Sequence, residues 1–366
     1  MTTLFDSYQL GGLSLPNRLV MAPMARVRAT ADGLATPSMA AYYGQRTTAG
    51  LLITEGVQPS LVGQSTPNTP GLYNDEQTAS WRQVTDAVHV NGGRIFAQLM
   101  HAGRIAHPDT TGLQPVAPSA VAAGHVFTPT GFQPAPVPRA LGTAEAAEEA
   151  RSYAKAARRA IDAGFDGVEL HGAAGYLISQ FLSSNANLRT DRYGGSLTNR
   201  IRFAVEAVAA TVDAIGAERT GIRLSPGGGF LGTDETDVVD LYSELLAELA
   251  RLDVAYIHLL LSADDEVLLG LRRAWPGALI MNPTPPLKGP QAGRGPEVGR
   301  EEADLWLKHG ADLISFGRAF IANPDLVERL RSGLPLAPVD ETTLYEGGDA
   351  GYITYPTYRH TAGAAQ

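Results

Sequence analysis

Polar side chains able to bind a ligand stand at the ends of short apolar runs along this chain. Gln98, His171 and Arg223 each occur at the end of such a run, and the pair Gly317-Arg318 follows the last run. A Gly-Arg pair directly after a strand suits a phosphate group, because backbone N–H groups and a guanidinium both interact with an anion. The chemistry indicated is therefore the binding of a phosphorylated small molecule beside hydrogen-bonding side chains.

The elements that would position these residues alternate between short β-branched runs and helical stretches, which is typical of repeated βα units. Eight strands are predicted, over residues 18–21, 51–54, 95–99, 167–170, 221–224, 255–260, 278–281 and 313–316. Eight units favour a closed (β/α)8 TIM barrel of the α/β class. In such a barrel the residues that follow the strands converge on one face, where active sites lie.

Two helices and a hairpin are the clearest local predictions. Helices are expected from Thr143 to Ala163, with Thr143 as N-cap and Glu145 in the first turn, and from Ser196 to Ile215. The N-terminal segment predicts a hairpin turning at Gly11-Gly12, which would close the bottom of the barrel.

Two long βα loops interrupt the pattern, at residues 107–141 and 282–299. Loops of this length are usually functional or mobile, and the first is a candidate lid over the barrel mouth. With no interdomain linker, residues 1–366 are expected to form one barrel domain with a frayed tail at about 360–366.

Composition narrows the class of partner. The net charge of −9 and the pI of about 5.4, with no basic cluster, argue against nucleic acid and anionic membranes as partners. The absence of cysteine excludes disulfides, thiolate catalysis and Cys-ligated metals, and no metal site is predicted. The N-terminus has no signal-peptide pattern, so a cytoplasmic protein acting on small molecules, as a monomer or homodimer, is expected.

Longer motifs resemble the Old Yellow Enzyme family over about residues 4–355. They include LPNRLVMAPMAR at 15–26, ITEG at 53–56, FAQLMHAGR at 96–104, ISFGRAFIANPDLVERL at 314–330 and YEGGDAGYITYP at 345–356. The most specific is GVELHGAAGYLISQFLSSNANLRTDRYGGSLTNRIRF at 167–203.

This resemblance implies an FMN-binding barrel reduced by NADPH or NADH. The cofactor-binding residues it implies around the ring are Pro23, Met24, Ala25, Gly56, Gln98 and Arg223. Arg223 would lie near flavin N1, where a cation stabilises the anionic reduced flavin. The phosphate would rest on Gly317 and Arg318, with Gly295 from the 282–299 loop.

The resemblance also implies a reaction, the reduction of the activated C=C bond of an α,β-unsaturated carbonyl or a similar electron-poor substrate. Tyr176 corresponds to the tyrosine that protonates the α-carbon, and its ordinary pKa of about 10 suits that role. His171 corresponds to one of two residues that hydrogen-bond the activating oxygen.

The substrate side departs from the family pattern. Ala174 occupies the second oxygen-binding position, where the family has His or Asn, and so offers no donor. Losing such a donor typically costs about 2.7–4 kcal/mol. Ala25, Met100 and Thr66 replace other usual pocket residues, and Tyr352 is a further substrate-binding candidate. A specialised, bulky substrate is therefore expected.

Two alternatives to an NAD(P)H-dependent ene-reductase stay open. The altered oxygen site also fits an FMN-dependent dehydrogenase or isomerase of the same fold. A barrel that binds flavin without enone turnover is the other alternative.

Overall fold

Eight parallel strands form a closed barrel in the computed structural model, which describes residues 2–284 and 299–358. In barrel order the strands are β3 (Leu19–Met21), β4 (Leu51–Val57), β5 (Ile95–Leu99), β10 (Gly167–Gly172), β11 (Thr220–Leu224), β12 (Tyr256–Leu260), β13 (Leu279–Asn282) and β14 (Leu313–Phe316). All eight predicted strands are confirmed.

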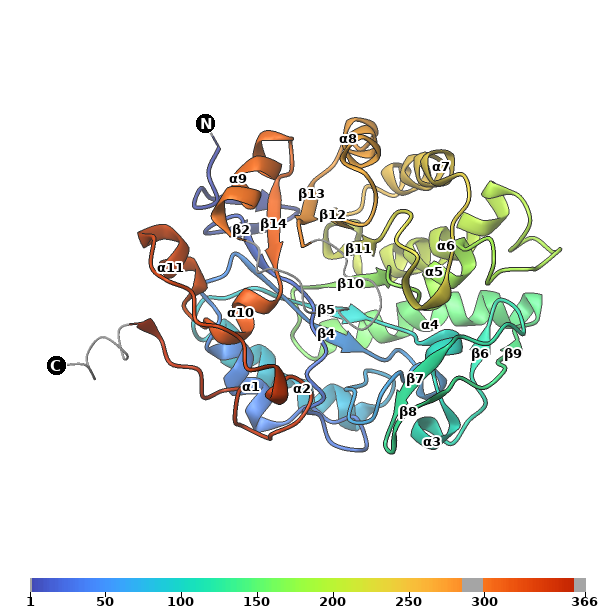
Figure 1. The fold of residues 1–366 in the computed structure, drawn as a ribbon, viewed down its shortest axis with the longest axis horizontal. Helices are drawn as coiled ribbons and strands as arrows, with labels where there is room; N and C mark the ends of the chain where they lie inside the picture. The colour runs from blue at the N-terminus through green and yellow to red at the C-terminus, as the bar shows by residue number, and fades with distance from the viewer. Residues whose placement is uncertain (1, 285–298, 359–366) are drawn as a thin grey trace.

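Helices surround these strands (Figure 1). They are α1 (Pro37–Gly44), α2 (Asp75–His89), α4 (Thr143–Asp162), α5 (Leu177–Leu182), α6 (Leu197–Ile215), α7 (Val238–Arg251), α8 (Asp265–Ala274), α9 (Arg300–Lys308), α10 (Arg318–Ala322) and α11 (Leu326–Ser332). The long α4 and α6 confirm the two predicted helices. The predicted N-cap of α4 is wrong by one residue: Gly142 is the N-cap, and its N–H donates to Glu145 Oε2 at 2.7 Å.

The N-terminal hairpin closes one end of the barrel, as predicted. Its strands are β1 (Tyr8–Leu10) and β2 (Leu13–Leu15), and Gly11 between them has a φ of 55°. Leu10 and Leu15 are buried in a cluster with Phe96 and Tyr256 of the barrel interior. Functional residues must therefore lie at the opposite end, where the strands finish.

The loop between residues 107 and 141 is more ordered than the sequence suggests. It contains the short helix α3 (Pro108–Thr111), a parallel pair formed by β6 (Val116–Ala117) and β9 (Arg139–Ala140), and an antiparallel hairpin formed by β7 (His125–Thr128) and β8 (Gly131–Pro134). The strands are only two to four residues long, which is too short for an alternating pattern to be recognised among the Pro and Gly residues of this loop.

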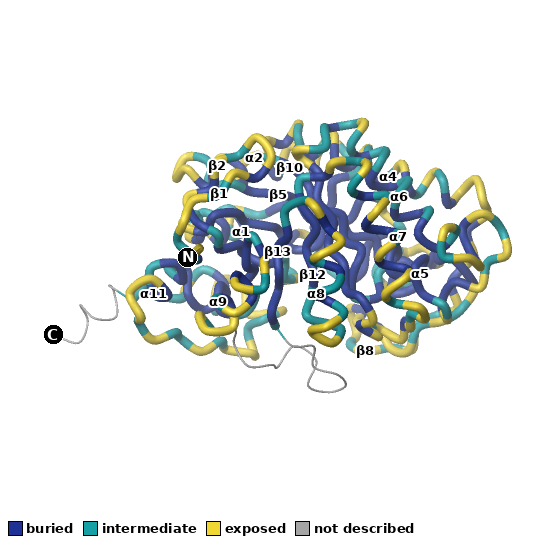
Figure 2. Tube along the Cα trace, turned by 90° about the horizontal axis from the view of Figure 1, so that it is seen from above, coloured by how far each residue is buried: buried dark blue, intermediate teal, exposed yellow. Residues whose placement is uncertain are grey.

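Burial follows the barrel (Figure 2). The barrel strands are buried except for the half-buried Leu260 at the end of β12, and the inward faces of the surrounding helices pack on them in one continuous core. Within the described ranges, no helix is long and apolar enough to cross a membrane.

Candidate active site

A cavity of about 200 Å³ lies at the carboxyl ends of the barrel strands. It is lined by the predicted residues Pro23, Met24, Ala25, Gly56, Thr66, Gln98, Met100, His171, Ala174, Tyr176 and Arg223, together with Val27, Glu55, Ser65 and Thr69. Residues from five strands or the loops that follow them thus meet at one opening, as βα topology requires.

Strand register explains how the polar residues meet. His171 on β10 is paired with Arg223 on β11, and Glu169 on β10 is paired with Gln98 on β5. Because alternate residues of a strand point to the same side, these four side chains enter the barrel interior in two adjacent layers.

Two nitrogen groups in this interior lack internal partners. Arg223 Nε and His171 Nδ1 are buried and accept or donate no hydrogen bond within the described chain. Buried polar groups are normally paired, so these atoms fit a bound polar ligand. Burial and the neighbouring Arg223 lower the pKa of His171 to about 3, so its ring is neutral at physiological pH.

Tyr176 lies beside His171, with ring centroids 4.9 Å apart. It is the N-cap residue of α5, directly after a turn in which Ala174 and Gly175 both have positive φ. Burial raises the pKa of Tyr176 to about 12, with Tyr345 adding to the effect. The phenol is therefore held protonated more firmly than its ordinary pKa would give.

Comparisons with known proteins decide the family. A model described as the NADH:flavin oxidoreductase / NADH oxidase family matches residues 3–337. The chain belongs to this family. A probable flavin mononucleotide-dependent alkene reductase of Leishmania infantum is 40% identical, over 95% of this chain and 95% of that protein.

Solved structures agree with this assignment. The old yellow enzyme homologue from Zymomonas mobilis has a TM-score of 0.91 at 38% identity, covering 97% of this chain and 99% of its own. A structure of morphinone reductase in complex with tetrahydroNAD has a TM-score of 0.89 at 40% identity, covering 98% of both chains. The predicted resemblance is confirmed, and the chain is an FMN-dependent oxidoreductase reduced by a nicotinamide.

The cavity fits a flavin ring in its chemistry. Arg223 offers a buried guanidinium with a free Nε. At Gly56 an added Cβ would lie 2.5 Å from Met100 Cε, so a larger residue there would displace the Met100 thioether from its place in the wall. A planar, electron-accepting ring flanked by a cation is the group that such a wall would hold.

The predicted phosphate residues lie outside this cavity. Gly317 is near Met24, since a Cβ added at Gly317 would be 3.6 Å from Met24 Sδ. Arg318 begins α10 and forms an ion pair with Glu341 at 2.6 Å. Gly295 lies outside the described residues. A phosphate bound here would have to share Arg318 with Glu341.

Tyr352 does not reach the cavity. It is fully buried, and its ring stacks on Tyr42 with centroids 4.2 Å apart. The structure instead brings Tyr345, seven residues earlier, close enough to Tyr176 to affect its pKa. Sequence position alone could not separate these two tyrosines of one motif.

Sequence reasoning also missed Glu55, a buried carboxylate in the cavity wall. Its Oε2 accepts the Arg26 N–H at 3.3 Å and its Oε1 accepts the Tyr43 hydroxyl at 3.4 Å. Burial raises the pKa of Glu55 to about 7. An acidic residue inside an apolar strand was the available signal, because a buried charge needs dedicated partners.

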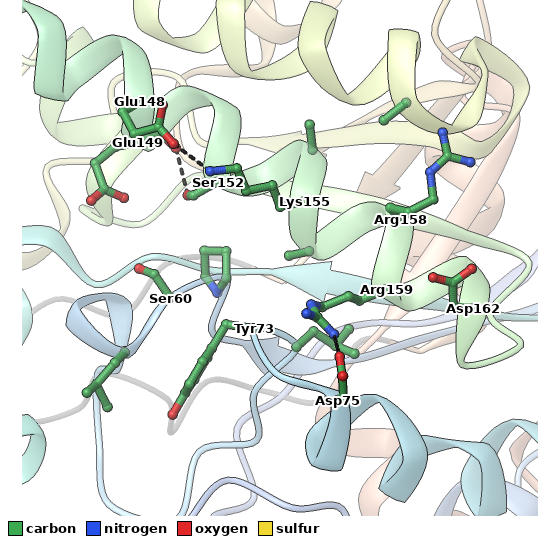
Figure 3. A pocket seen from close by; sticks show the side chains of 16 residues that line it. Ser60, Tyr73, Asp75, Glu148, Glu149, Ser152, Lys155, Arg158, Arg159 and Asp162 are labelled. Carbon is green, nitrogen blue, oxygen red and sulfur yellow. Dashed lines mark hydrogen bonds and ion pairs between the residues drawn. The ribbon is translucent and has the colours of Figure 1, made fainter.

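A second, larger hollow lies between α2 and α4 and is a less suitable site (Figure 3). Four of its charged side chains already pair with one another, Lys155 with Glu148 and Arg159 with Asp75. These pairs are largely solvated and worth little energetically. Size therefore does not identify the active site here, whereas the position at the carboxyl ends of the barrel strands does.

Proposed function

We propose that this enzyme reduces the C=C bond of an α,β-unsaturated carbonyl, or of a similar electron-poor alkene, at the cavity at the barrel mouth. The observation that carries the proposal is that a neutral His171 with an unpartnered Nδ1 lies beside a protonated Tyr176 in the cavity that Arg223 also lines. FMN supplies the hydride when it is bound.

His171 would bind the activating oxygen of the substrate. A neutral imidazole carries one N–H, which can donate to that oxygen as negative charge develops on it. His171 cannot act as a proton store, because its pKa is about 3. Its contribution is electrostatic and depends on the position of its ring.

Tyr176 would deliver the proton. The β-carbon gains a hydride, the phenol O–H bond breaks, and its proton forms the new C–H bond at the α-carbon. The phenolate then recovers a proton from water. A donor with a pKa of about 12 stays protonated over the physiological range.

We further propose that the substrate is bulky and that residues 1–366 act as one barrel domain. Ala25 and Ala174 leave space in the cavity wall, and the flexible thioether of Met100 can adapt to a large ligand.

The FMN contacts are proposed as follows. Pro23, Met24 and Gly56 would contact the ring of FMN, Gln98 its pyrimidine edge, and Gly317 and Arg318 its phosphate. Thr66 would contact the substrate.

Anaerobic half-reactions test the proposed chemistry with the Tyr176→Phe variant. The flavin absorbance of both proteins should bleach with NADPH or NADH at similar rates. On addition of an enone, the wild-type colour should return, whereas Tyr176→Phe should recover roughly a hundredfold or more slowly. Equal recovery rates would remove Tyr176 from the mechanism, and no recovery in the wild type would refute enone reduction.

A further inference from the structure

Behind Gln98 a buried series of hydrogen bonds crosses the barrel interior. We propose that Glu169 is a positioning residue that fixes the direction of the Gln98 amide, so that Gln98 presents its carbonyl oxygen, and not its nitrogen, to the cofactor. The inference rests on the proposed place of Gln98 at the pyrimidine edge of FMN.

Each carboxylate oxygen of Glu169 has a hydrogen-bond partner, and the buried Tyr256 hydroxyl is a further neighbour, whose pKa burial and Glu169 raise well above its ordinary value. Glu169 Oε1 accepts from Gln98 Nε2 at 2.8 Å, and its Oε2 is 2.8 Å from His258 Nδ1. Glu169, Gln98 and His258 are all buried. The register of β5 with β10 places Gln98 opposite Glu169, so the contact follows from the pairing of the strands.

The charge on Glu169 is supported from several sides. Burial alone would raise its pKa, but His258, Arg223 and Gln98 together hold the pKa of Glu169 below its ordinary value. An ionised carboxylate can only accept hydrogen bonds. Both neighbours must therefore face Glu169 with N–H groups.

The hydrogen bonds on the other side of His258 also favour an N–H directed from His258 to Glu169. Asn282 Nδ2 donates to Ser315 Oγ at 2.9 Å, and Ser315 Oγ lies 2.8 Å from His258 Nε2. Burial lowers the pKa of His258, so its ring is neutral and carries one N–H. With that N–H directed to Glu169, Nε2 accepts the Ser315 hydroxyl, and every donor in the series has an acceptor.

The consequence for Gln98 is a fixed polarity. Its nitrogen is committed to Glu169, and its Oε1 has no partner within the described chain, although the side chain lines the cavity. The pyrimidine edge of a flavin presents an N–H between two carbonyl oxygens. A Gln98 oxygen accepts that N–H, whereas a reversed amide would oppose it with another donor.

Exchanging the two side chains tests this polarity. Glu169→Gln offers Gln98 and His258 one acceptor and one donor where both need an acceptor, so the Gln98 amide can reverse. The double variant Gln98→Glu with Glu169→Gln restores the pattern: the new amide accepts from His258 and donates to the new carboxylate, which accepts the flavin N–H.

Two readouts follow, the FMN dissociation constant from flavin fluorescence and the midpoint potential of bound FMN. We expect Glu169→Gln to weaken FMN binding at least tenfold relative to the wild type. The double variant should bind FMN at least threefold more tightly than Glu169→Gln does. The double variant should also have a lower midpoint potential than the wild type, because a negative charge has moved next to the ring and disfavours reduction.

Glu235→Gln is the matched control. Glu235 is another carboxylate with two partners, accepting from Gly227 N at 2.8 Å and from the Tyr242 hydroxyl at 2.9 Å, although it is only half-buried where Glu169 is fully buried. It lies outside the cavity wall. This variant should lose some stability but leave the FMN dissociation constant and the midpoint potential unchanged.

The outcomes separate the inference from the proposed reaction. Wild-type FMN affinity in Glu169→Gln, or a folded double variant that binds no better than the single one, would overturn the inference. If the single variant does not fold, the double variant must still fold and bind FMN, since it restores the hydrogen-bond pattern among positions 98, 169 and 258; its failure would also overturn the inference. Failure to reduce enones would refute the proposed function alone.

Discussion

At the scale of single residues, Ala174 is unfavourable in two ways: its backbone conformation is strained, and its side chain offers no hydrogen-bond donor. Its φ of 56° lies in the left-handed region, which a non-glycine residue occupies at a cost of about 1 kcal/mol. Its N–H donates to Ser225 Oγ at 2.9 Å, which holds the turn in place. Asn tolerates this conformation better than Ala and would also supply a donor.

Ala174→Asn is therefore expected to improve both stability and rate. Relief of backbone strain should raise the free energy of unfolding by up to about 1 kcal/mol. The added carboxamide should raise kcat/KM for a small enone such as cyclohexenone by tenfold or more, since one oxyanion donor is worth about 2.7–4 kcal/mol. Thermal unfolding and steady-state kinetics measure the two effects.

Ala174→Gly is the control, because glycine relieves the strain without adding a donor. It should reproduce the backbone gain and leave the rate on cyclohexenone unchanged. A rate gain in both variants would show that flexibility of the turn, and not the missing donor, limits the reaction.

At the scale of elements, Glu55 of β4 holds the turn that follows β3. Val27 in this turn has a φ of 57°, an unfavourable conformation for a β-branched residue. The neighbouring Arg26 N–H is accepted by Glu55 Oε2, and the Glu55 N–H donates to the Tyr43 hydroxyl of α1. One buried carboxylate thus joins β3, β4 and α1 at the cavity wall.

This arrangement predicts a pH dependence of stability. The pKa of Glu55 rises from 4.5 when unfolded to about 7 when folded, so the folded protein binds the extra proton between these values. The contribution of Glu55 to the free energy of unfolding is fully present below pH 4.5 and is lost as the pH rises through about 7. The loss amounts to at most about 3 kcal/mol. Glu55→Gln should remove this slope.

The measurement is the difference in unfolding free energy between the wild type and Glu55→Gln at pH 5 and pH 8. Taking the difference cancels the contribution of His171, whose lowered pKa makes stability fall as the pH decreases from about 6.5 toward about 3. A difference that does not change between pH 5 and pH 8 would mean that Glu55 titrates normally.

Helices and strands were predictable from the sequence where the spacing of apolar residues or a family motif indicates them. The apolar run at 51–54 predicted β4, but nothing in it shows that Glu55 would bind the backbone of another loop. Likewise, Gln98 and Arg223 were predicted at the cavity, whereas the contacts of Glu169 with His258 depend on strand register. Such contacts join residues far apart in sequence, and no local pattern specifies them.

At the scale of the whole molecule, residues 341–353 form a C-terminal strap over the β3 turn. The strap lies beyond residues 3–337, which the family model matches, yet it contributes Tyr345 beside Tyr176. In Figure 1 it is the red segment that crosses near α1 and α2. The C-terminal segment thus lies near a site whose lining residues run from Pro23 to Arg223.

Arg28 holds this strap through backbone carbonyls. Its guanidinium donates to Thr343 O at 2.7 Å, Gly348 O at 3.0 Å and Leu344 O at 3.2 Å, and also to Glu346 O. Because Arg26 also donates to Leu344 O at 3.0 Å and to Gly351 O at 2.8 Å, loss of Arg28 should loosen the strap around Glu346 and Gly348. Each hydrogen bond to a charged group is worth about 1.5–3 kcal/mol.

Arg28→Met should therefore expose the strap to a glutamate-specific protease, with a new cleavage after Glu346 while the barrel stays folded. Arg158→Met, which changes an exposed arginine on α4, serves as the control and should keep the wild-type digestion pattern. A wild-type pattern in Arg28→Met would show that the remaining contacts are sufficient to hold the strap, namely the Arg26 hydrogen bonds to Leu344 O and Gly351 O and the stacking of Tyr352 on Tyr42.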